Sequence, residues 1–342
     1  MLPQVLRAGE WLLKSGIQDP DGGVARYYRL ETGRNLAVST EITAYAASTF
    51  VFLGGNQMLE RAHAAARFLT RAWHDDLGTM PFEVDPAEFT YFFDCGIVVR
   101  GLLAVWRASG DESCLQCASA VGDAMARDFR GADGDVHPVL ALPGKYPADR
   151  DPLRWSRSPG CYQLKAGMAW WELWEATGRA CYRELYENLR DQSLRTDRSF
   201  LPGHSDRRKV VDRLHAFAYF LEGLLPMPCA ALGEGIQRMA ELLRELAPEF
   251  ERSDAYAQLL RIRLYADASG AVPLDRAAAQ WEAERLLEFA ATSADPRIDG
   301  GFYFGRTGSQ WEPFINPVST AFALQALALW NGDAEANRHL LI

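Results

Sequence analysis

Hydrophobic and polar positions define two kinds of helical segment along this chain. Segments of the first kind are amphipathic, with apolar residues three or four positions apart and charged residues between them; they span 2–16, 56–73, 112–129, 180–196, 231–248 and 273–292. Segments of the second kind are apolar on nearly every side and span 39–54, 89–109, 159–177, 212–225, 251–268 and 317–331. The two kinds alternate strictly. The pattern therefore predicts six helical hairpins, a repeat of about 57 residues in a chain of 342.

An all-α fold follows from the two kinds of helix. A helix that is apolar all round must be covered on every side, whereas an amphipathic helix needs cover on one side only. Six such hairpins predict a closed (α/α)6 toroid, a barrel with the apolar helices inside and the amphipathic helices outside. No Pro/Gly/Ser-rich linker interrupts the hairpin series, so we predict a single toroid domain over residues 1–342.

The links between the helices differ in length according to their position. The links 53–56, 109–112 and 176–180 are tight turns, whereas 19–39, 75–88, 131–159, 196–211 and 295–315 are long and rich in aromatic residues. In a ring of hairpins the long links emerge at one end, where they form a mouth with short β-hairpins. The apolar helices begin at that mouth and point their free N–H groups toward it. We therefore expect the functional site at the mouth.

Charge and composition narrow the classes of ligand and location. The net charge of −9 disfavours binding to nucleic acid or to anionic membranes. No signal peptide and no apolar run of membrane-spanning length is visible, which favours the cytoplasm. Cys114 and Cys117 form a C-x-x-C inside a helix without a second ligand pair, so we expect neither a metal nor a cofactor. Two long links carry several basic residues, including Arg150, Arg154 and Arg208, which favours an anionic ligand.

Asp94 is the first candidate for chemistry. It lies near the start of segment 89–109, directly after Tyr91, Phe92 and Phe93. A carboxylate among apolar residues must be paired, protonated or functional, because burial of an isolated charge is costly. Asp94 therefore either caps its helix or pairs with an arginine, or it acts as a catalytic acid or base.

The segment that begins Asp94-Cys95-Gly96 and ends in the turn Ser109-Gly110-Asp111 resembles a segment of unsaturated glucuronyl and rhamnogalacturonyl hydrolases, which are six-hairpin glycosidases. In that family an Asp-x-Gly opens an inner helix and a Thr/Ser-Gly-Asp turn ends it. The resemblance implies that Asp94 is a catalytic acid/base that hydrates a 4,5-unsaturated uronic acid. The family's second aspartate would open the next inner helix, where SPGCYQLKAGMAWW contains no acid.

Three further residues are candidates for acid/base chemistry. Glu41 follows Ser39 and Thr40 at the start of an apolar helix, where it either belongs to the helix cap or pairs with Asp94. Asp212 and His215 are spaced i, i+3 in the apolar segment 212–225. This spacing allows an Asp–His hydrogen bond with His215 as a proton donor or acceptor, although a satisfied core histidine fits the pattern equally well.

Aromatic and charged residues of the long links are candidates for substrate binding. Exposed rings need a reason, which is either stacking on a sugar or packing on one another. The candidate set is Tyr28, Arg154, Trp155, Arg207, Arg208, Trp311 and Glu312. Trp155 and Trp311 each adjoin a charged residue, and this arrangement favours a role in ligand binding.

A second resemblance concerns the last hairpin. Residues 299–330, DGGFYFGRTGSQWEPFINPVSTAFALQALALW, are similar to the repeat of terpenoid cyclases and protein prenyltransferase β subunits, which also form a six-hairpin ring. Neither the Asp-x-Asp-Asp acid motif nor the prenyltransferase zinc ligands are present. The resemblance therefore implies the ring and adds little chemistry.

These patterns together predict a carbohydrate-active enzyme, a hydrolase, lyase or epimerase, that acts on an acidic, uronate-type glycan. The expected ligand is an oligosaccharide or a small acidic sugar. The alternatives are an isoprenoid-binding or isoprenoid-cyclising protein and a glycan-binding protein without catalysis. The sequence leaves the oligomeric state open.

Overall fold

The computed structural model describes residues 2–131, 135–151 and 153–342. Twelve α-helices lie in these residues, and each of them overlaps one of the twelve segments predicted from the hydrophobic pattern. The all-α prediction is therefore confirmed at the level of the elements. The chain divides into two compact units, unit 1 (Met1–Asp19, Ala25–Leu36 and Ser199–Ile342) and unit 2 (Pro20–Val24 and Ala37–Arg198). The prediction of a single domain stays a prediction.

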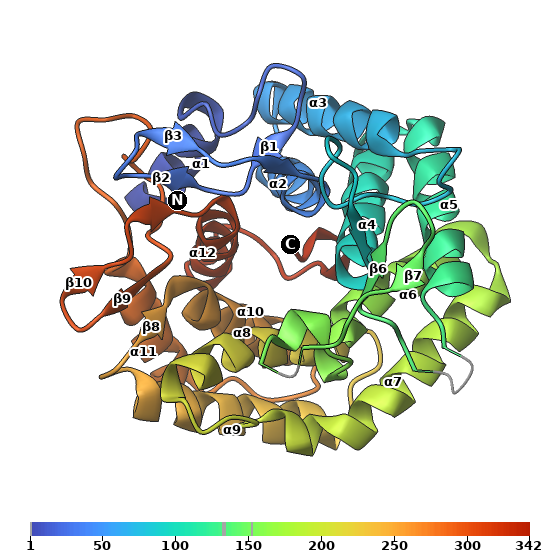
Figure 1. Cartoon of the computed structure of the whole chain (residues 1–342). Coiled ribbons are helices and arrows are strands. Elements are labelled where there is room, and N and C mark those ends of the chain that lie inside the picture. Colours follow the sequence, from blue (N-terminus) through green and yellow to red (C-terminus); the bar gives the residue numbers. More distant parts are fainter. Residues whose placement is uncertain (1, 132–134, 152) are drawn as a thin grey trace. The chain divides into compact units, whose positions relative to one another are not determined.

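Unit 2 contains three helical hairpins, each closed by a tight turn (Figure 1). The hairpins are α2 (Thr40–Leu53) with α3 (Asn56–Ala72), α4 (Phe92–Ser109) with α5 (Glu112–Asp128), and α6 (Leu164–Thr177) with α7 (Ala180–Phe200). Helix α4 packs against α2, α5 and α6, and its residues Phe92–Val105 are all buried. Gly96 and Gly101 allow this close packing, because a Cβ on them would lie 2.5 Å from Ala166 Cα and 2.7 Å from Ala44 O.

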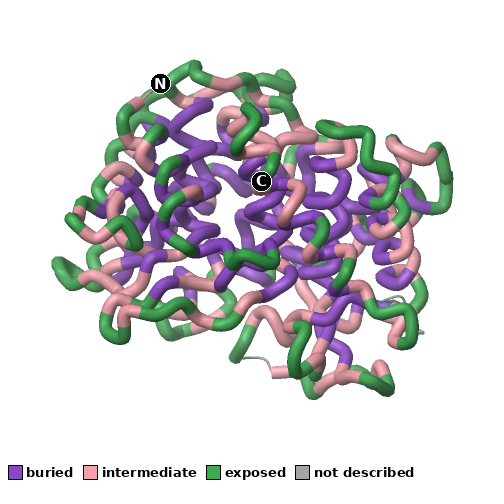
Figure 2. The backbone as a smooth tube through the Cα atoms, turned by 90° about the horizontal axis from the view of Figure 1, so that it is seen from above, coloured by how far each residue is buried: buried purple, intermediate pink, exposed green. Residues whose placement is uncertain are grey.

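Unit 1 contains the other three hairpins. They are α8 (Arg207–Gly223) with α9 (Ala230–Leu246), α10 (Ser253–Ala268) with α11 (Arg276–Leu287), and α12 (Pro317–Trp330) with α1 (Pro3–Lys14). The partner of α1 corrects the sequence reading, which counted 2–16 and 39–54 as one hairpin. A long link separates α1 from α2. Helix α1 packs instead on α12, which lies near the other end of the sequence. Figure 2 shows how buried and exposed stretches alternate along the backbone.

Short strands lie in the long links, which confirms the predicted β-hairpins. In unit 2, β5 (Phe89–Tyr91), β6 (Val139–Ala141) and β7 (Tyr146–Pro147) form one antiparallel sheet. In unit 1, β8 (Glu251–Arg252), β9 (Gly305–Thr307) and β10 (Gln310–Trp311) form a second, and β2 (Tyr28–Arg29), β3 (Arg34–Asn35) and β11 (Phe314–Ile315) a third. The remaining strands are β1 (Val24–Ala25) and β4 (Val38–Ser39).

Four helix starts differ from the prediction by three residues or more, among them α11, which begins at Arg276 and not at 273. Helix α4 begins at Phe92 and not at 89, because Phe89–Tyr91 pair with β6. Helix α6 begins at Leu164, after the 3-10 turns Trp155–Arg157 and Cys161–Gln163. Helix α8 begins five residues earlier than 212, where the Asp206 carboxylate accepts from Arg208 N at 3.0 Å and caps the helix.

None of the helices in the described residues is both long and apolar enough to cross a membrane. The hydropathy of the sequence led to the same expectation. A location in the cytoplasm stays a prediction.

Candidate functional site

Two acidic side chains lie in the first turns of neighbouring helices of unit 2. Asp94 lies in the first turn of α4, and Glu41 lies in the first turn of α2. The Asp94 side chain is buried, with an exposed fraction of 8%. Burial raises the pKa of Asp94 well above its ordinary value, and the negative charge of Glu41 raises it further. Asp94 therefore holds its proton to a higher pH than an exposed aspartate does.

Neither structural explanation predicted for Asp94 applies in the described part of the chain. Tyr91 is the N-cap of α4, and no side chain caps this helix. No cation lowers the pKa of Asp94. Glu41 is likewise not the cap of α2, because Ser39 Oγ accepts from Ile42 N at 3.4 Å. The two acids thus form a carboxyl pair, which we call the acid pair.

Two tyrosines lie within the electrostatic reach of Asp94. Burial raises the pKa of Tyr162, and the charge of Asp94 raises it further. The pKa of Tyr91 is raised by the same two causes in the same order. The rings also join the aromatic surroundings of the pair, since Tyr162 contacts Phe93 at a centroid distance of 6.1 Å and Tyr91 contacts Phe82 at 5.3 Å. Both phenols stay protonated. The Tyr162 hydroxyl donates to Ser158 O at 3.0 Å, whereas the Tyr91 hydroxyl can donate to a ligand oxygen.

The predicted binding residues Arg154 and Trp155 lie close to these tyrosines. Trp155 packs edge-on against Tyr162 with a centroid distance of 4.9 Å. The charges of Arg157 and Arg154 oppose the rise in the pKa of Tyr91 without cancelling it. Arg157 also donates a hydrogen bond to the Tyr91 side chain. Arg154 is exposed and pairs with Asp151 at 3.5 Å. Unit 2 thus brings together Asp94, Glu41, Arg154 and Trp155 of the predicted site.

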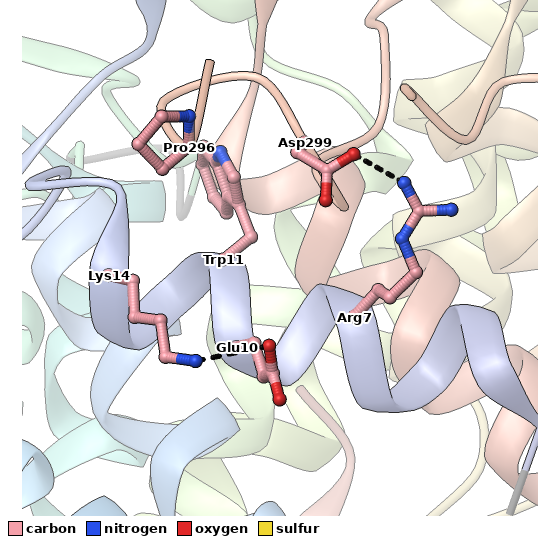
Figure 3. Close-up of a pocket in the computed structure, with 6 residues that line it drawn as sticks. All are labelled: Arg7, Glu10, Trp11, Lys14, Pro296 and Asp299. Atoms are coloured by element: carbon pink, nitrogen blue, oxygen red, sulfur yellow. Dashed lines mark hydrogen bonds and ion pairs between the residues drawn. The ribbon is translucent and has the colours of Figure 1, made fainter. Parts of the chain in front are cut away.

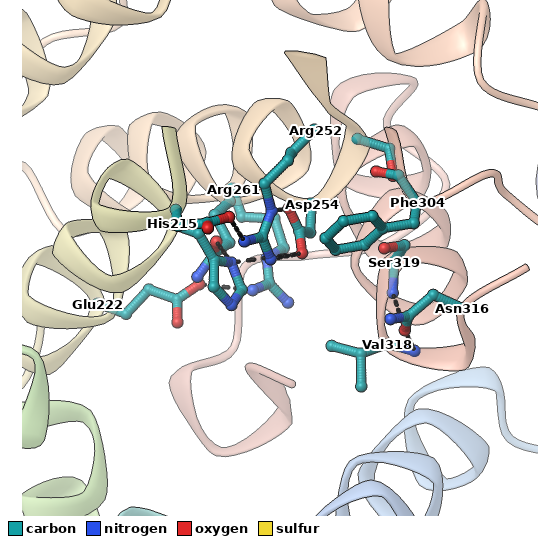
Figure 4. A network of polar contacts seen from close by, with 12 residues as sticks. His215, Glu222, Arg252, Asp254, Arg261, Phe304, Asn316, Val318 and Ser319 are labelled. Carbon is teal, nitrogen blue, oxygen red and sulfur yellow. Dashed lines mark hydrogen bonds and ion pairs between the residues drawn. The ribbon is translucent and has the colours of Figure 1, made fainter. Parts of the chain in front are cut away.

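A second polar centre lies in unit 1, where His215, Arg252 and Asp254 point toward one another (Figure 4). Arg252 donates to both Asp254 oxygens, at 2.9 and 2.7 Å, and to Asp212 Oδ1 at 2.7 Å. This bonding lowers the pKa of Asp254 despite its burial. Burial lowers the pKa of His215 to about 4, against the opposing charge of Asp254. The histidine is therefore neutral near pH 7. We call this group the arginine centre.

Asp212 and His215 both have partners from outside α8. Asp212 accepts from Arg252, whereas His215 Nδ1 lies 2.7 Å from Gln258 Oε1 and 3.5 Å from Asp254 Oδ2. These partners come from β8 and α10, and they fit the alternative of a satisfied core histidine. The hydrogen bond between Asp212 and His215 stays a prediction.

The other predicted binding residues of unit 1 have partners within that unit. Arg207 forms ion pairs with Glu245 and Glu249, and Arg208 forms one with Glu312. The Trp311 ring stacks on Tyr303 at a centroid distance of 5.0 Å and contacts Phe289 edge-on at 5.3 Å. Tyr28 is 3% exposed, and Arg297 lies over its ring. These contacts fit the packing explanation of the loop aromatics, and the binding roles of these residues stay predictions.

The sequence reading missed Tyr162, Arg157, Arg252 and Asp254. Asp254 carried a usable signal, because it lies in the first turn of an inner helix, as Asp94 and Glu41 do. Arg157 and Tyr162 lie in 3-10 turns that no periodic pattern marks. No group of three or more His, Cys, Asp or Glu side chains in the described residues could hold a metal ion.

A small pocket lies on the outer side of unit 1, beside α1 (Figure 3). Its volume is about 140 Å³, and its lining consists of Arg7, Glu10, Trp11, Lys14, Pro296 and Asp299. The charged residues of the lining are paired with one another, Arg7 with Asp299 and Lys14 with Glu10. None of the predicted site residues lines it.

Comparisons with known proteins identify the fold. No family model and no curated protein matches the chain. A sugar epimerase from a ruminal bacterium superposes with a TM-score of 0.70 at 12% identity, over 96% of this chain and 99% of that one. The cellobiose 2-epimerase from Spirochaeta thermophila gives 0.68 at 18%, over 94% and 93%. A type II terpene cyclase from Scytonema gives 0.57 at 16%, over 96% and 97%. The chain therefore has the (α/α)6 toroid fold that the hydrophobic pattern predicted.

Proposed function

We propose that the protein is a carbohydrate-active enzyme that transfers protons on an acidic sugar and uses Asp94 and Glu41 as its acid and base. One observation carries the proposal. Asp94 is buried, and its pKa is raised, first by burial and then by the charge of the neighbouring Glu41 carboxylate. Two carboxyl groups whose pKa values are driven apart form an acid and a base at the same pH.

An acidic sugar fits the residues around the acid pair. The guanidinium group of Arg157 and the hydroxyl of Tyr91 lie together and offer a charged and a neutral donor to a carboxylate. The half-buried Trp155 adds aromatic surface, on which the C–H face of a pyranose packs well. This combination supports a uronate as the substrate class.

Epimerisation or isomerisation is the reaction type that the comparisons support best, because two of the similar structures are a sugar epimerase and a cellobiose 2-epimerase. In the open-chain sugar, the Glu41 carboxylate removes the proton from the carbon next to the carbonyl group, and Asp94 gives its proton to the carbonyl oxygen. The product of this step is an enediol. Return of one proton to carbon and one to a carboxylate regenerates a carbonyl sugar and the acid pair.

Proton exchange in deuterated water tests this proposal. The protein is incubated in D2O with glucuronate, galacturonate, mannose or cellobiose. Proton NMR follows the hydrogen on the carbon next to the carbonyl group, whose signal disappears when deuterium replaces it. We expect deuterium at this carbon of glucuronate or galacturonate, and no exchange with Asp94→Asn or Glu41→Gln. Exchange into mannose or cellobiose alone would contradict the acidic substrate. Hydrolysis of a uronate disaccharide without deuterium at carbon would instead assign the pair to glycosidic bond cleavage. Absence of both reactions would contradict the proposal.

An isoprenoid substrate is the second candidate, because a protonated acid among aromatic rings can also protonate an alkene. The likeness to the terpene cyclase concerns the fold alone. The Arg157 guanidinium and the Glu41 carboxylate disfavour this candidate, since a hydrocarbon offers neither of them a partner.

A further inference from the structure

We propose that one face of the sheet β5–β6–β7 binds the further sugar units of an oligosaccharide whose first unit reaches the acid pair. This inference rests on the proposed function and adds the length of the substrate to it. The observation behind it is a row of side chains that leads from Tyr91 to the exposed ring of Tyr146.

The register of the sheet defines the row. Phe89 pairs with Ala141, and Ala141 pairs with Tyr146. Directly paired residues of antiparallel strands point to the same face, and so do residues two apart on one strand. Tyr91, Phe89, Ala141 and Tyr146 therefore share a face of the sheet.

The opposite face of the sheet points into unit 2. Thr90 and Leu140, which pair with each other, are both 0% exposed. Thr90 Oγ1 donates to Met80 O at 2.6 Å and so fixes this side of the strand inward. The face that carries the row is consequently the outward one, which agrees with the half-buried Phe89 and Tyr91 and with the exposed Tyr146.

Tyr146 is the unusual member of the row. Its side chain is 73% exposed, the largest fraction among the large hydrophobic residues of the described chain. The ring lies against Gly144, where a Cβ would meet Tyr146 Cε2 at 2.2 Å. An exposed aromatic ring beside a residue without a side chain offers its face to a ligand.

The order of groups along the row matches the chemistry of a uronate oligosaccharide. One end is Tyr91, whose phenol feels the charge of Asp94. In the middle the Arg157 guanidinium lies over the Phe89 ring at 5.7 Å and offers a cation to a carboxylate. Tyr146 lies two strand spacings beyond Phe89, about 10 Å away, which is further than one sugar ring reaches. A chain of sugar units spans this distance, whereas a monosaccharide at the acid pair does not.

Binding measurements on a series of chain lengths test the row. Isothermal titration calorimetry is done with galacturonate mono-, di-, tri- and tetrasaccharides on the Asp94→Asn variant, so that turnover does not interfere. We expect the affinity to rise with length until the ligand reaches Tyr146. In the same background, Tyr146→Ala should weaken binding of the longer ligands about five- to tenfold and leave the monosaccharide unchanged, as expected for the loss of one aromatic contact.

Three matched variants separate stacking from other effects. Tyr146→Phe keeps the ring and should bind as the parent does. Gly144→Ala displaces the ring and should reproduce the loss seen with Tyr146→Ala. Leu6→Ala removes an exposed apolar side chain of α1 and should have no effect.

Two results would overturn the proposal that the row binds sugar units. One is a binding affinity that does not depend on the length of the oligosaccharide. The other is a loss of affinity in Tyr146→Ala that is equal for the monosaccharide and the tetrasaccharide. Failure to bind any of the oligosaccharides would overturn it as well. Deuterium exchange into a monosaccharide would still leave the proposed function standing in each of these cases.

Discussion

The acid pair of unit 2 and the arginine centre of unit 1 begin from the same local structure and reach opposite charge states. Asp94 and Asp254 both lie buried in the first turn of an inner helix, and neither caps its helix. Asp254 has Arg252 bound to both of its oxygens, so its pKa is lowered. Asp94 has Glu41 as its charged neighbour, so its pKa is raised. The nearest charge, and not the helix position, decides whether a buried carboxyl group keeps its proton.

The opposite pKa shifts of Asp94 and Asp254 indicate different roles. The acid pair is suited to proton transfer, whereas the arginine centre is suited to stabilising the fold. A carboxyl group that keeps its proton beside a carboxylate can give and take protons near neutral pH. A carboxylate bound at both oxygens by a guanidinium group is a poor proton acceptor, because protonation would cost the ion pair. We therefore expect changes at Asp94 to affect turnover and changes at Arg252 to affect stability.

Substitution of Asp94 by Asn has the largest expected effect. The amide keeps the size of the side chain but can no longer transfer a proton, so the proposed deuterium exchange should fall about 10²- to 10⁴-fold. The free energy of unfolding should stay unchanged or rise, because a buried ionisable group has been removed. NMR exchange rates and urea unfolding measure the two quantities. Asp76→Asn, an exposed position in the same unit, is the control. An active Asp94→Asn protein would remove Asp94 from the mechanism.

Substitution of Arg252 by Met should act on stability instead. The change leaves the buried Asp254 carboxylate without its cation, which costs about 3–5 kcal/mol of unfolding free energy. Urea unfolding at pH 7, followed by circular dichroism, measures the loss. The double variant Arg252→Met/Asp254→Asn should recover a large part of it, since the unpaired charge is gone. A loss below about 1 kcal/mol in the single variant would mean that the pair is not buried as the structure has it.

The pH dependence of stability should have opposite signs at the two centres. The folded protein holds the pKa of His215 at about 4, below the ordinary 6.5. Its contribution is therefore complete above pH 6.5 and is lost as the pH falls toward 4, by about 3 kcal/mol in total. Asp94 contributes in the reverse sense, because its raised pKa favours the folded state at low pH and loses that contribution as the pH rises.

Thermal unfolding between pH 7 and pH 4 separates the two contributions. His215→Gln should flatten the fall in stability toward low pH, whereas Asp94→Asn should remove a loss of stability toward high pH. Identical profiles for the wild type and the His215→Gln variant would show that the imidazole is not desolvated.

The exposed ion pair between Arg208 and Glu312 provides the smallest expected effect. Their side chains are 55% and 23% exposed, so water screens the interaction. A double-mutant cycle with Arg208→Gln and Glu312→Gln should give a coupling of about 0–1 kcal/mol. A coupling as large as that of the buried Arg252–Asp254 pair would contradict the view that burial separates these contacts.

The sequence predicted the helices well because the amphipathic helices bury residues periodically and the apolar helices are buried along nearly their whole length. Twelve segments, the tight turns and the β-hairpins in the long links could all be read from hydrophobic spacing and from the positions of Gly. The start of α4 at Phe92 was missed, because the three residues before it, Phe89–Tyr91, form strand β5. This strand pairs with β6, about 50 positions later in the sequence. The pairing of α1 with α12 was missed for the same reason.

The candidate site was predictable only in part. Asp94 and Glu41 were found because an acid at the start of an apolar helix contrasts with its surroundings. Their neighbours outside the periodic helices could not be found this way. Arg157 bonds to Tyr91 and Tyr162 lies near Asp94, both from irregular turns, and Arg252 reaches Asp212 from a different hairpin. The Arg252 partner of Asp212 and the Gln258 partner of His215 could not be predicted either, because both come from other elements than α8.

The pKa of the Asp94 carboxyl group is the most direct measure of the difference between the two centres. Carbon NMR of the protein labelled at the aspartate carboxyl carbons follows this group through a pH titration, with Asp94→Asn as the assignment control. The Asp94 resonance should titrate well above the range of exposed aspartates, and Glu41→Gln should move its midpoint downward. A midpoint in the ordinary aspartate range that does not respond to Glu41→Gln would contradict the assignment of the acid pair.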